Sequence, residues 1–393
     1  MSIVETKKLA VGYNNKVVID NIELEIKKGE VICLLGPNGA GKSTILKTIS
    51  GQLQSVKGNV YIYNEDIKKI NQSNLAKKMS VVLTERVIPS LMTSFEFAAM
   101  GRYQYTGFFG KLSDEDVNIV NEILKLVNAE NLANRYFEQL SDGEKQKILL
   151  ARALCQEPEI IILDEPTSYL DIRHKFELLN ILNKLSKEKG ITVILSLHEV
   201  DMALKGCDTA VLVKDGKIMK KGCCEDIIKE DVIKKLYGLE FGNFSSLLGT
   251  LEIPSSIKKS RVFVISGEGK GIPIYRFLTK HQYEVCTGII YENDIDYYIA
   301  NILGVNIIKE KAFESIKEIN FKKAVNCMKK CEKIIDAGST FAELNKLNVD
   351  LIRNALEVGK KVYSFRDKDE CKKLFKENYK KLIYCNSVKD VID

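Results

Sequence analysis

Short apolar runs alternate with stretches of helical periodicity from Val31 to about Leu239. This alternation is typical of βαβ units, in which helices cover a parallel sheet. Two of the apolar runs, Val31 to Leu35 and Ile160 to Leu163, end abruptly at glycine-rich or acidic sequence. The pattern predicts an α/β domain in which these two runs are buried strands.

The alternation breaks between Phe241 and Ser260, where glycine, serine and proline accumulate. Six further apolar runs follow, and stretches of helical length separate most of them, which predicts a second, smaller parallel-sheet α/β domain. These runs are Arg261 to Ile265, Glu284 to Ile290, Val305 to Ile308, Lys333 to Ile335, Lys361 to Phe365 and Lys381 to Tyr384. We expect a first domain at 1–244, a linker at 245–260 and a Rossmann-like accessory domain at 261–393, with regulation as its hypothetical role.

The segment GPNGAGKST follows the first strand and precedes a helical stretch. Its glycines let the backbone bend so that successive N–H groups and the helix N-terminus face anionic oxygens. Lys42 supplies a positive charge for the β and γ phosphates, and the Ser43 hydroxyl suits Mg²⁺. The predicted nucleotide-binding residues of this loop are Gly36, Asn38, Gly39, Gly41, Lys42, Ser43 and Thr44.

Two carboxylates follow the second strand, in Asp164-Glu165-Pro166. The strand delivers both side chains to the edge of the sheet, where Asp164 is placed to hold Mg²⁺ and Glu165 to polarise an attacking water. An acidic turn alone would have no catalytic meaning. Together with the phosphate-binding loop, it indicates hydrolysis of a bound nucleotide, with Mg²⁺ as the expected metal cofactor.

Composition excludes several other classes of protein. The chain has 393 residues, 45% of them hydrophobic and 28% charged, and no run approaches the roughly 18 apolar residues of a membrane helix. The net charge of +6 is not concentrated as in nucleic-acid-binding proteins. No secretory signal is visible at the start, so we expect the chain to stay in the cytosol.

Ten cysteines are scattered along the chain. The closest in sequence are Cys223 with Cys224 and Cys327 with Cys331, and they do not form the paired CxxC units of a zinc site. We interpret them as reduced thiols. Only three histidines are present, which argues against a histidine-rich metal centre.

The segment LSDGEKQ, from Leu140 to Gln146, resembles the signature motif of ATP-binding cassette (ABC) ATPases. Ser141 and Glu144 also fit a capping box, which would open a helix with its N-terminus free to face a phosphate. The resemblance implies a P-loop NTPase ABC cassette with a RecA-like core and a helical subdomain at about 88–145.

The resemblance extends over about 240 residues and implies further roles. Tyr13 matches the aromatic residue that stacks on adenine, Asp171 ends the loop that crosses the dimer, and His198 matches the switch histidine. It also implies a head-to-tail homodimer in which Ser141 and Gly143 of one subunit close on the ATP of the other. Glu165 and His198 would then be the catalytic residues.

Two positions depart from the family pattern. Thr84 and Glu85 stand where the family has a glutamine that reaches Mg²⁺, and either side chain could ligate the ion. Asp142 replaces a usual glycine in the signature motif, and we expect it to turn toward solvent in the first helical turn.

Three further segments resemble importer ATPases for iron-siderophores, haem and cobalamin: Met100 to Tyr103, Leu170 to His174 and Glu230 to Gly238. The resemblance implies an ATPase at the cytoplasmic face of the membrane that works with a permease and a solute-binding protein. Three alternatives remain at this stage: an ABC ATPase for another small solute, a soluble ABC ATPase acting on nucleic acid or ribosomes, and a nucleotide-gated module without turnover.

The second domain has a glycine-rich turn, SGEGKG, after its first apolar run. It lacks the full GxGxxG spacing, so tight strand-to-helix packing is the simpler interpretation. Two more polar loops, at 291–296 and 336–340, also follow apolar runs. If the sheet is parallel, all three loops gather at its carboxyl edge, and our hypothesis is that they sense a small anion or nucleotide.

Overall fold

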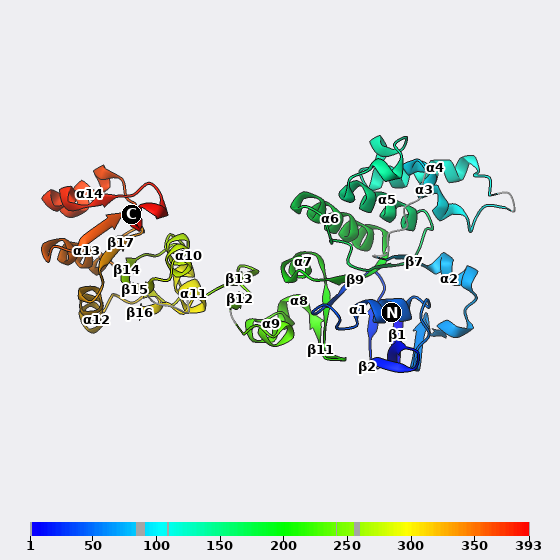
Figure 1. The fold of residues 1–393 in the computed structure, drawn as a ribbon, viewed down its shortest axis with the longest axis horizontal. Helices are drawn as coiled ribbons and strands as arrows, with labels where there is room; N and C mark the ends of the chain where they lie inside the picture. Colours follow the sequence, from blue (N-terminus) through cyan, green and yellow to red (C-terminus); the bar gives the residue numbers. More distant parts are fainter. Residues whose placement is uncertain (1, 84–90, 108–109, 241, 255–259, 393) are drawn as a thin grey trace. The chain divides into compact units, whose positions relative to one another are not determined.

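The computed structural model describes residues 2–83, 91–107, 110–240, 242–254 and 260–392 (Figure 1). Contacts within the chain divide it into two compact units, Met1–Gly238 and Leu239–Asp393. In the described part of the chain, no helix combines the length and the apolar character needed to cross a membrane.

The first unit is built on a six-stranded sheet with the order β11-β10-β4-β9-β8-β7. Its strands are β4 (Val31–Leu35), β7 (Met79–Val82), β8 (Ile160–Leu163), β9 (Thr192–Leu197), β10 (Thr209–Lys214) and β11 (Lys217–Cys223). All neighbours pair in parallel except β10 and β11. The two strands predicted from the apolar runs are confirmed and fully buried. Because β9 lies between them, the carboxyl ends of three adjacent strands share one edge.

A second, mainly antiparallel sheet covers helix α1 (Lys42–Ile49). It contains β1 (Ser2–Tyr13), β2 (Lys16–Ile22), β3 (Glu25–Lys27), β5 (Lys57–Ile62) and β6 (Glu65–Asp66). Apolar residues of this sheet, such as Leu9 and Ile19, share one buried cluster with Ile45 of α1 and Ile160 of the first sheet. The helix that follows the phosphate-binding loop is thus fixed from both sides.

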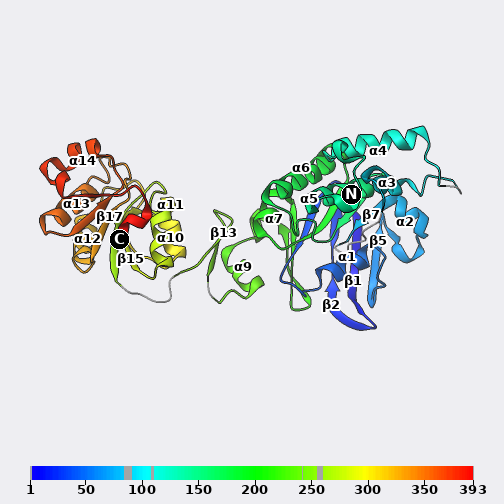
Figure 2. The ribbon, with the colours of Figure 1, turned by 45° about the horizontal axis from the view of Figure 1, so that its top comes forward.

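The remaining helices of the first unit form a helical layer and a set that flanks the central sheet (Figure 2). The helical layer comprises α3 (Ser94–Ala99), α4 (Asp114–Leu126) and α5 (Asp142–Leu154), which contact one another. The others are α2 (Gln72–Lys78), α6 (Ile172–Lys189), α7 (Val200–Gly206), α8 (Cys224–Ile227) and α9 (Glu230–Tyr237). The predicted helical subdomain, at about 88–145, includes α3 and α4, whereas α5 continues to Leu154; the predicted start of the subdomain lies outside the described residues.

The second unit has a fully parallel sheet with the order β16-β15-β14-β17-β18-β19. Its strands are β14 (Arg261–Ile265), β15 (Glu284–Tyr291), β16 (Asn306–Glu310), β17 (Lys333–Asp336), β18 (Lys361–Ser364) and β19 (Ile383–Tyr384). When the strands are numbered within this sheet, from β14 as the first, the order is 3-2-1-4-5-6, the Rossmann arrangement. The predicted parallel-sheet domain is confirmed.

Helices cover both faces of this sheet. The helices are α10 (Ile272–Lys280), α11 (Ile295–Ile302), α12 (Glu318–Lys329), α13 (Leu347–Glu357) and α14 (Lys368–Phe375). Along β14, Val262 and Val264 pack with residues of α10 and α11, whereas Phe263 and Ile265 pack with residues of α12 and α13. Successive side chains of a strand point to opposite faces of the sheet, so each face has its own hydrophobic core.

The boundary between the units lies a few residues before the predicted one. Strands β12 (Asn243–Ser245) and β13 (Thr250–Glu252) form a hairpin that belongs to the second unit. Asn243 Nδ2 donates to the Ile302 carbonyl at 2.8 Å, and Arg276 Nε donates to Glu252 at 3.0 Å. Three-residue strands in glycine- and serine-rich sequence give too weak a pattern to distinguish them from a linker.

Candidate nucleotide-hydrolysis site

The loop between β4 and α1 needs glycine at two points for steric reasons. A Cβ at Gly36 would lie 2.1 Å from the Val213 carbonyl oxygen, and one at Gly41 would lie 2.7 Å from Ile19 Cδ1. Gly41 also has a φ of 98°, in the region that favours glycine. The loop therefore approaches β10 and β2 closely, and its backbone curls directly into the N-terminus of α1.

Lys42 is held inside this curl. Its Nζ donates to the carbonyl oxygens of Gly36 at 2.8 Å and Pro37 at 3.0 Å, and the residue is 4% exposed. Burial lowers the pKa of Lys42, while the carboxylates of Glu165 and Asp164 oppose that shift. The hydrogen-bond partners of this buried ammonium group are uncharged carbonyl oxygens. A nearby anion would stabilise its positive charge, so the loop is suited to binding phosphate.

Asp164 is fixed by two hydroxyl groups from different elements. Ser43 Oγ in α1 donates to Asp164 Oδ1 at 3.0 Å, and Ser196 Oγ in β9 donates to the same oxygen at 2.7 Å. The Ser43 hydroxyl and the Asp164 carboxylate thus place two oxygen atoms 3.0 Å apart. Neighbouring ligands of an octahedral Mg²⁺ ion are also about 3.0 Å apart, because Mg–O bonds are about 2.1 Å long. This set of hard oxygen donors fits Mg²⁺.

Glu165 and His198 contact each other at the carboxyl ends of β8 and β9. His198 Nε2 lies 2.5 Å from Glu165 Oε1, and both side chains are partly exposed. The φ of Glu165 is 49°, in the left-handed region that is uncommon for residues other than glycine. Its backbone N–H donates to Ser196 Oγ at 2.8 Å, which secures this conformation. The carboxylate can accept a proton from water while the imidazole orients it.

Ser196 is a residue of the site that the sequence motifs do not predict. It is fully buried within an apolar strand and links the backbone of Glu165 to the side chain of Asp164. The sequence does place a hydroxyl residue near the end of the apolar run that precedes the predicted histidine. Only the order of the strands shows that this hydroxyl group reaches Asp164 and Glu165.

The signature residues form a separate group at the start of α5. Ser141 is the N-cap in a capping box with Glu144, as predicted, and Asp142 is exposed in the first turn. A Cβ at Gly143 would lie 2.6 Å from the ring of His174. Asp171 caps α6 and accepts hydrogen bonds of 2.8 Å from the backbone N–H and Nδ1 of His174. The ring of His174 thus links Gly143 to Asp171, and Ser141 lies at the N-cap of the same helix as Gly143.

The other predicted residues are placed as follows. Tyr13 ends β1 in the turn toward β2 and is 47% exposed. Asn38 is exposed in the loop, and Thr44 is buried in α1. Thr84 and Glu85 lie outside the described residues, so their proposed role as Mg²⁺ ligands stays a prediction.

The three polar loops of the second unit meet at the carboxyl edge of its sheet, as the sequence predicts. The Glu268 carboxylate accepts a hydrogen bond from the backbone N–H of Thr340 at 3.1 Å. The backbone N–H groups of Glu268 and Gly271 donate to Asp294 at 3.0 Å and to Asp296 at 2.9 Å. Protein carboxylates thus already accept three of the N–H donors that the anion hypothesis requires, which favours the packing interpretation of this turn.

The fold and site of the first unit define a P-loop nucleotide hydrolase. The ABC transporter family matches residues 19–168, and the MJ0874 family matches residues 285–392. An uncharacterised ABC transporter ATP-binding protein of Methanocaldococcus jannaschii is 45% identical over 287 residues, 73% of this chain and 99% of that protein.

Two further similarities concern the first unit. The iron(3+)-hydroxamate import ATP-binding protein of Bacillus subtilis is 35% identical over 240 residues, 61% of this chain and 89% of that protein. A solved structure of a metal-chelate type ABC transporter in an inward-facing conformation matches with a TM-score of 0.54 and 25% identity, covering 61% of this chain and 90% of that one.

The chain belongs to the ATP-binding proteins of ABC transporters, and its first unit is an ATPase. The cassette predicted from the loop, the paired carboxylates and the signature motif is confirmed. Membership implies two kinds of partner, a membrane permease and a second cassette.

Proposed function

We propose that this chain hydrolyses ATP to power the import of an iron chelate through a membrane permease. The observation that carries the proposal is the convergence of Lys42, Asp164 and the Glu165–His198 pair at the ends of three adjacent strands. The similarity to an iron(3+)-hydroxamate import protein supports an iron chelate as the transported solute. A solute-binding protein would deliver the chelate, and the chain would act peripherally at the cytoplasmic face of the membrane.

The chemistry follows from the positions of the side chains. Lys42 and the loop N–H groups bind the phosphates, and Glu165 draws a proton from the attacking water while His198 orients the carboxylate. Ser43 and Asp164 would hold Mg²⁺, and the ion would supply charge neutralisation at the phosphates. Tyr13 would stack on the adenine ring.

The active assembly in this proposal is a homodimer of cassettes. Ser141 and Gly143 at the N-terminus of α5 would meet the γ-phosphate bound to the opposite chain, since helix N-termini favour anions.

Phosphate release from Mg-ATP by the purified chain tests the hydrolytic step. We expect Glu165→Gln to lose at least about a hundredfold in rate and to retain ATP binding, whereas Glu188→Gln, on the exposed side of α6, keeps the parental rate. Unchanged hydrolysis in Glu165→Gln would contradict the assignment of the base.

Uptake measurements test the solute. Cells that express the chain with its permease are given labelled ferric hydroxamate, haem or cobalamin in separate assays. Uptake of the ferric chelate that is lost in Glu165→Gln supports the proposal. Uptake of only haem or cobalamin, or co-purification with nucleic acid in place of a membrane protein, overturns it.

We also propose that the second unit regulates the cassette. The support is its Rossmann arrangement and its separation from the hydrolytic residues in the chain. Removal of residues 239–393 should preserve ATP hydrolysis and change the amount of solute imported per ATP. Unaltered coupling in the shortened chain would refute regulation without affecting the assignment of the cassette.

A further inference from the structure

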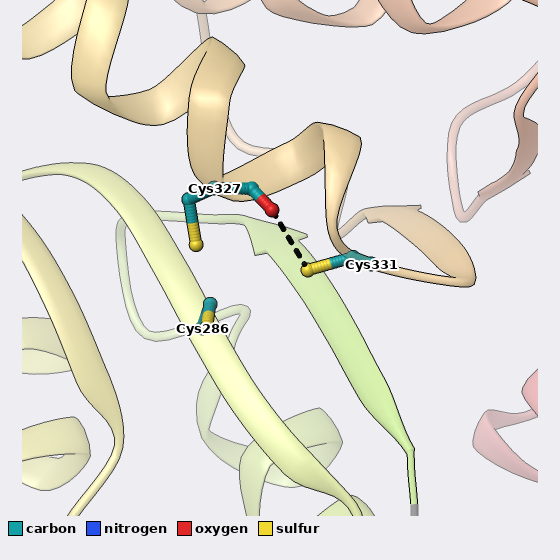
Figure 3. A group of neighbouring side chains, drawn as sticks. All are labelled: Cys286, Cys327 and Cys331. Carbon is teal, nitrogen blue, oxygen red and sulfur yellow. Dashed lines mark hydrogen bonds between the residues drawn. The ribbon is translucent and has the colours of Figure 1, made fainter.

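Three cysteines of the second unit meet in its core (Figure 3). Cys286 comes from β15, Cys327 from α12, and Cys331 from the segment directly after that helix. Their Sγ atoms all lie within 4.8 Å of one another. Among the residues that the structure describes, this is the one group of at least three His, Cys, Asp or Glu side chains that meets this condition. Sequence spacing concealed it, because Cys286 lies far from the other two along the chain.

The surroundings of the sulfurs are mainly apolar. Cys286 is 3% and Cys331 1% exposed, and both belong to a cluster with Phe263 and Met328. Cys327 is half-buried. Cys331 Sγ donates to the Cys327 carbonyl at 3.3 Å, and Asn306 Nδ2 lies 3.9 Å from Cys286 Sγ. The three sulfur atoms therefore gather at one place in this mainly apolar surrounding (Figure 3).

The spacing suits a metal ion bound by sulfur. A Zn–S bond is about 2.3 Å long, so tetrahedral geometry places two sulfurs about 3.8 Å apart. Sulfur atoms within 4.8 Å can reach that distance by side-chain movements of about 1 Å or less. Thiolates are soft ligands, which select ions such as Zn²⁺ or Cu⁺ over Mg²⁺ and Ca²⁺.

Charge favours a divalent ion. Three thiolates with Zn²⁺ carry one net negative charge, whereas with Cu⁺ they carry two. The positive charge of Arg261 favours the thiolate form of Cys286, but Arg261 Nε also donates to Glu284 at 2.7 Å. Lys360 Nζ donates to the Cys331 carbonyl at 2.7 Å and adds a second positive charge near the site. One residual negative charge can be balanced here more readily than two.

We propose that Cys286, Cys327 and Cys331 form a three-thiolate binding site for a divalent thiophilic metal ion of the Zn²⁺ class. Each thiol that binds loses its proton to solvent and forms one sulfur–metal bond. The half-buried side of Cys327 leaves access for the ion and for a fourth ligand from solution. The site is independent of the ATP-hydrolysing residues and does not depend on the transported solute.

Titration of the reduced, metal-free full-length chain with Cd²⁺ tests the site, because sulfur-to-cadmium charge transfer absorbs in the ultraviolet. We expect one strongly bound Cd²⁺ per chain, and competition by Zn²⁺. Cys286→Ser, Cys327→Ser and Cys331→Ser should each lower the affinity at least about a hundredfold.

Three other cysteines provide matched controls. Cys385→Ser removes a buried thiol elsewhere in the same unit, Cys207→Ser a buried thiol of the cassette, and Cys223→Ser an exposed one. All three variants should bind Cd²⁺ as the parent does. Absence of binding at one equivalent, or binding that survives in all three ligand variants, overturns the proposal.

A second measurement on the unmodified chain covers variants that fail to fold. One equivalent of Zn²⁺ should slow alkylation of Cys286, Cys327 and Cys331, mapped by mass spectrometry, and leave that of Cys223 unchanged. Equal alkylation with and without Zn²⁺, or a disulfide between two of the three cysteines under the same reducing conditions, contradicts a metal site.

Discussion

The hydroxyl group of Ser196 donates to Asp164 Oδ1 at 2.7 Å and accepts the backbone N–H of Glu165 at 2.8 Å. One buried side chain on β9 therefore orients both acidic residues that follow β8. Ser43 reaches the same carboxylate oxygen from α1. The position of Asp164, at the end of β8, is thus set by hydroxyl groups from α1 and β9, and Ser196 is a positioning residue that acts through Asp164 and Glu165.

Ser196→Ala should lower the rate of ATP hydrolysis about tenfold and raise the Mg²⁺ concentration needed for half-maximal rate. The reason is that the loss of a partner behind a metal ligand typically weakens metal affinity or activity about 10- to 100-fold. Phosphate release measured against Mg²⁺ at saturating ATP gives both values. Ser196→Thr retains the hydroxyl and should restore most of the activity, and an unchanged Mg²⁺ dependence in Ser196→Ala would refute the positioning role.

Gly143→Ala tests the contact between the signature helix and α6. The added Cβ would lie 2.6 Å from Cγ of His174, so either the ring or the start of α5 has to move. We expect slower hydrolysis with little change in ATP binding by the isolated chain, since the proposed target of this helix is the nucleotide of the opposite subunit. Equilibrium binding of a fluorescent ATP analogue and phosphate release separate the two effects.

A second substitution supplies the control for this contact. His174→Ala removes the ring that the new methyl group would meet, so the double variant should be more active than the product of the two single effects predicts. Strictly additive losses would show that the crowding at Gly143 comes from another source.

Much of the cassette could be predicted because its determinants are local. The loop from Gly36 to Thr44 and the Asp164–Glu165 pair each follow an apolar run, and strand order in a parallel sheet brings such ends together. Ser196 and the three-cysteine cluster could not be found in this way. Each depends on which strands are neighbours, and a polar side chain within an apolar run gives no periodic signal.

The domain boundary shows a different limit. The hairpin at 243–252 has short strands, and long-range contacts such as Arg276 with Glu252 stabilise it. Its composition alone resembles a linker. The glycine-rich turn of the second unit was predicted at the correct place, but its N–H donors are taken by Asp294 and Asp296, which only the fold reveals.

Arg102 should be a stability residue of the helical layer. Its Nε donates to Asp116 at 2.8 Å and its Nη1 to the Cys155 carbonyl at 2.9 Å, which ties α4 to the end of α5. The two side chains are 5% and 9% exposed. Arg102→Ala leaves a buried carboxylate without its cation, and we expect the cassette to lose about 3 kcal/mol in urea unfolding.

An exposed ion pair is the appropriate comparison for Arg102. Lys205 and Asp201 form one along α7 at 3.1 Å, and Lys205→Ala should cost less than about 0.5 kcal/mol. A similar, small effect of both substitutions would show that the Arg102 contacts do not stabilise the layer.

Asp116 gives the same layer a pH dependence at low pH. Hydrogen bonds from the backbone N–H and hydroxyl of Ser113, and then from Arg102, lower the pKa of Asp116 to about 2. This carboxylate therefore adds stability above its unfolded pKa of about 3.9, and the contribution is lost as the pH falls toward 2. Arg102→Ala should bring the pKa of Asp116 closer to its unfolded value. The free energy of unfolding should then change less steeply with pH between about pH 4 and pH 2.

Asp296 should have the opposite effect on the second unit. The residue is fully buried, and burial, together with the nearby carboxylate of Asp294, raises the pKa of its side chain to about 6. Between the unfolded pKa of about 3.9 and the folded value, the folded state binds a proton that the unfolded state does not. Stability of the second unit should therefore fall as the pH rises through about 6.

Asp296→Asn removes the charge and keeps an oxygen that can accept the Gly271 N–H. The variant should be more stable than the parent by roughly 3 kcal/mol at pH 8 and by about half of that at pH 5, and nearly equal to it below about pH 3.5. Thermal unfolding of the second unit from about pH 3.5 to pH 8 measures the difference. Asp369→Asn, an exposed carboxylate in α14, should leave the pH profile unchanged. If Asp296→Asn unfolds with the parental pH dependence, the ionisation of Asp296 does not limit the stability of this unit. The three loops at the sheet edge would then hold a buried, ionised carboxylate without loss of stability.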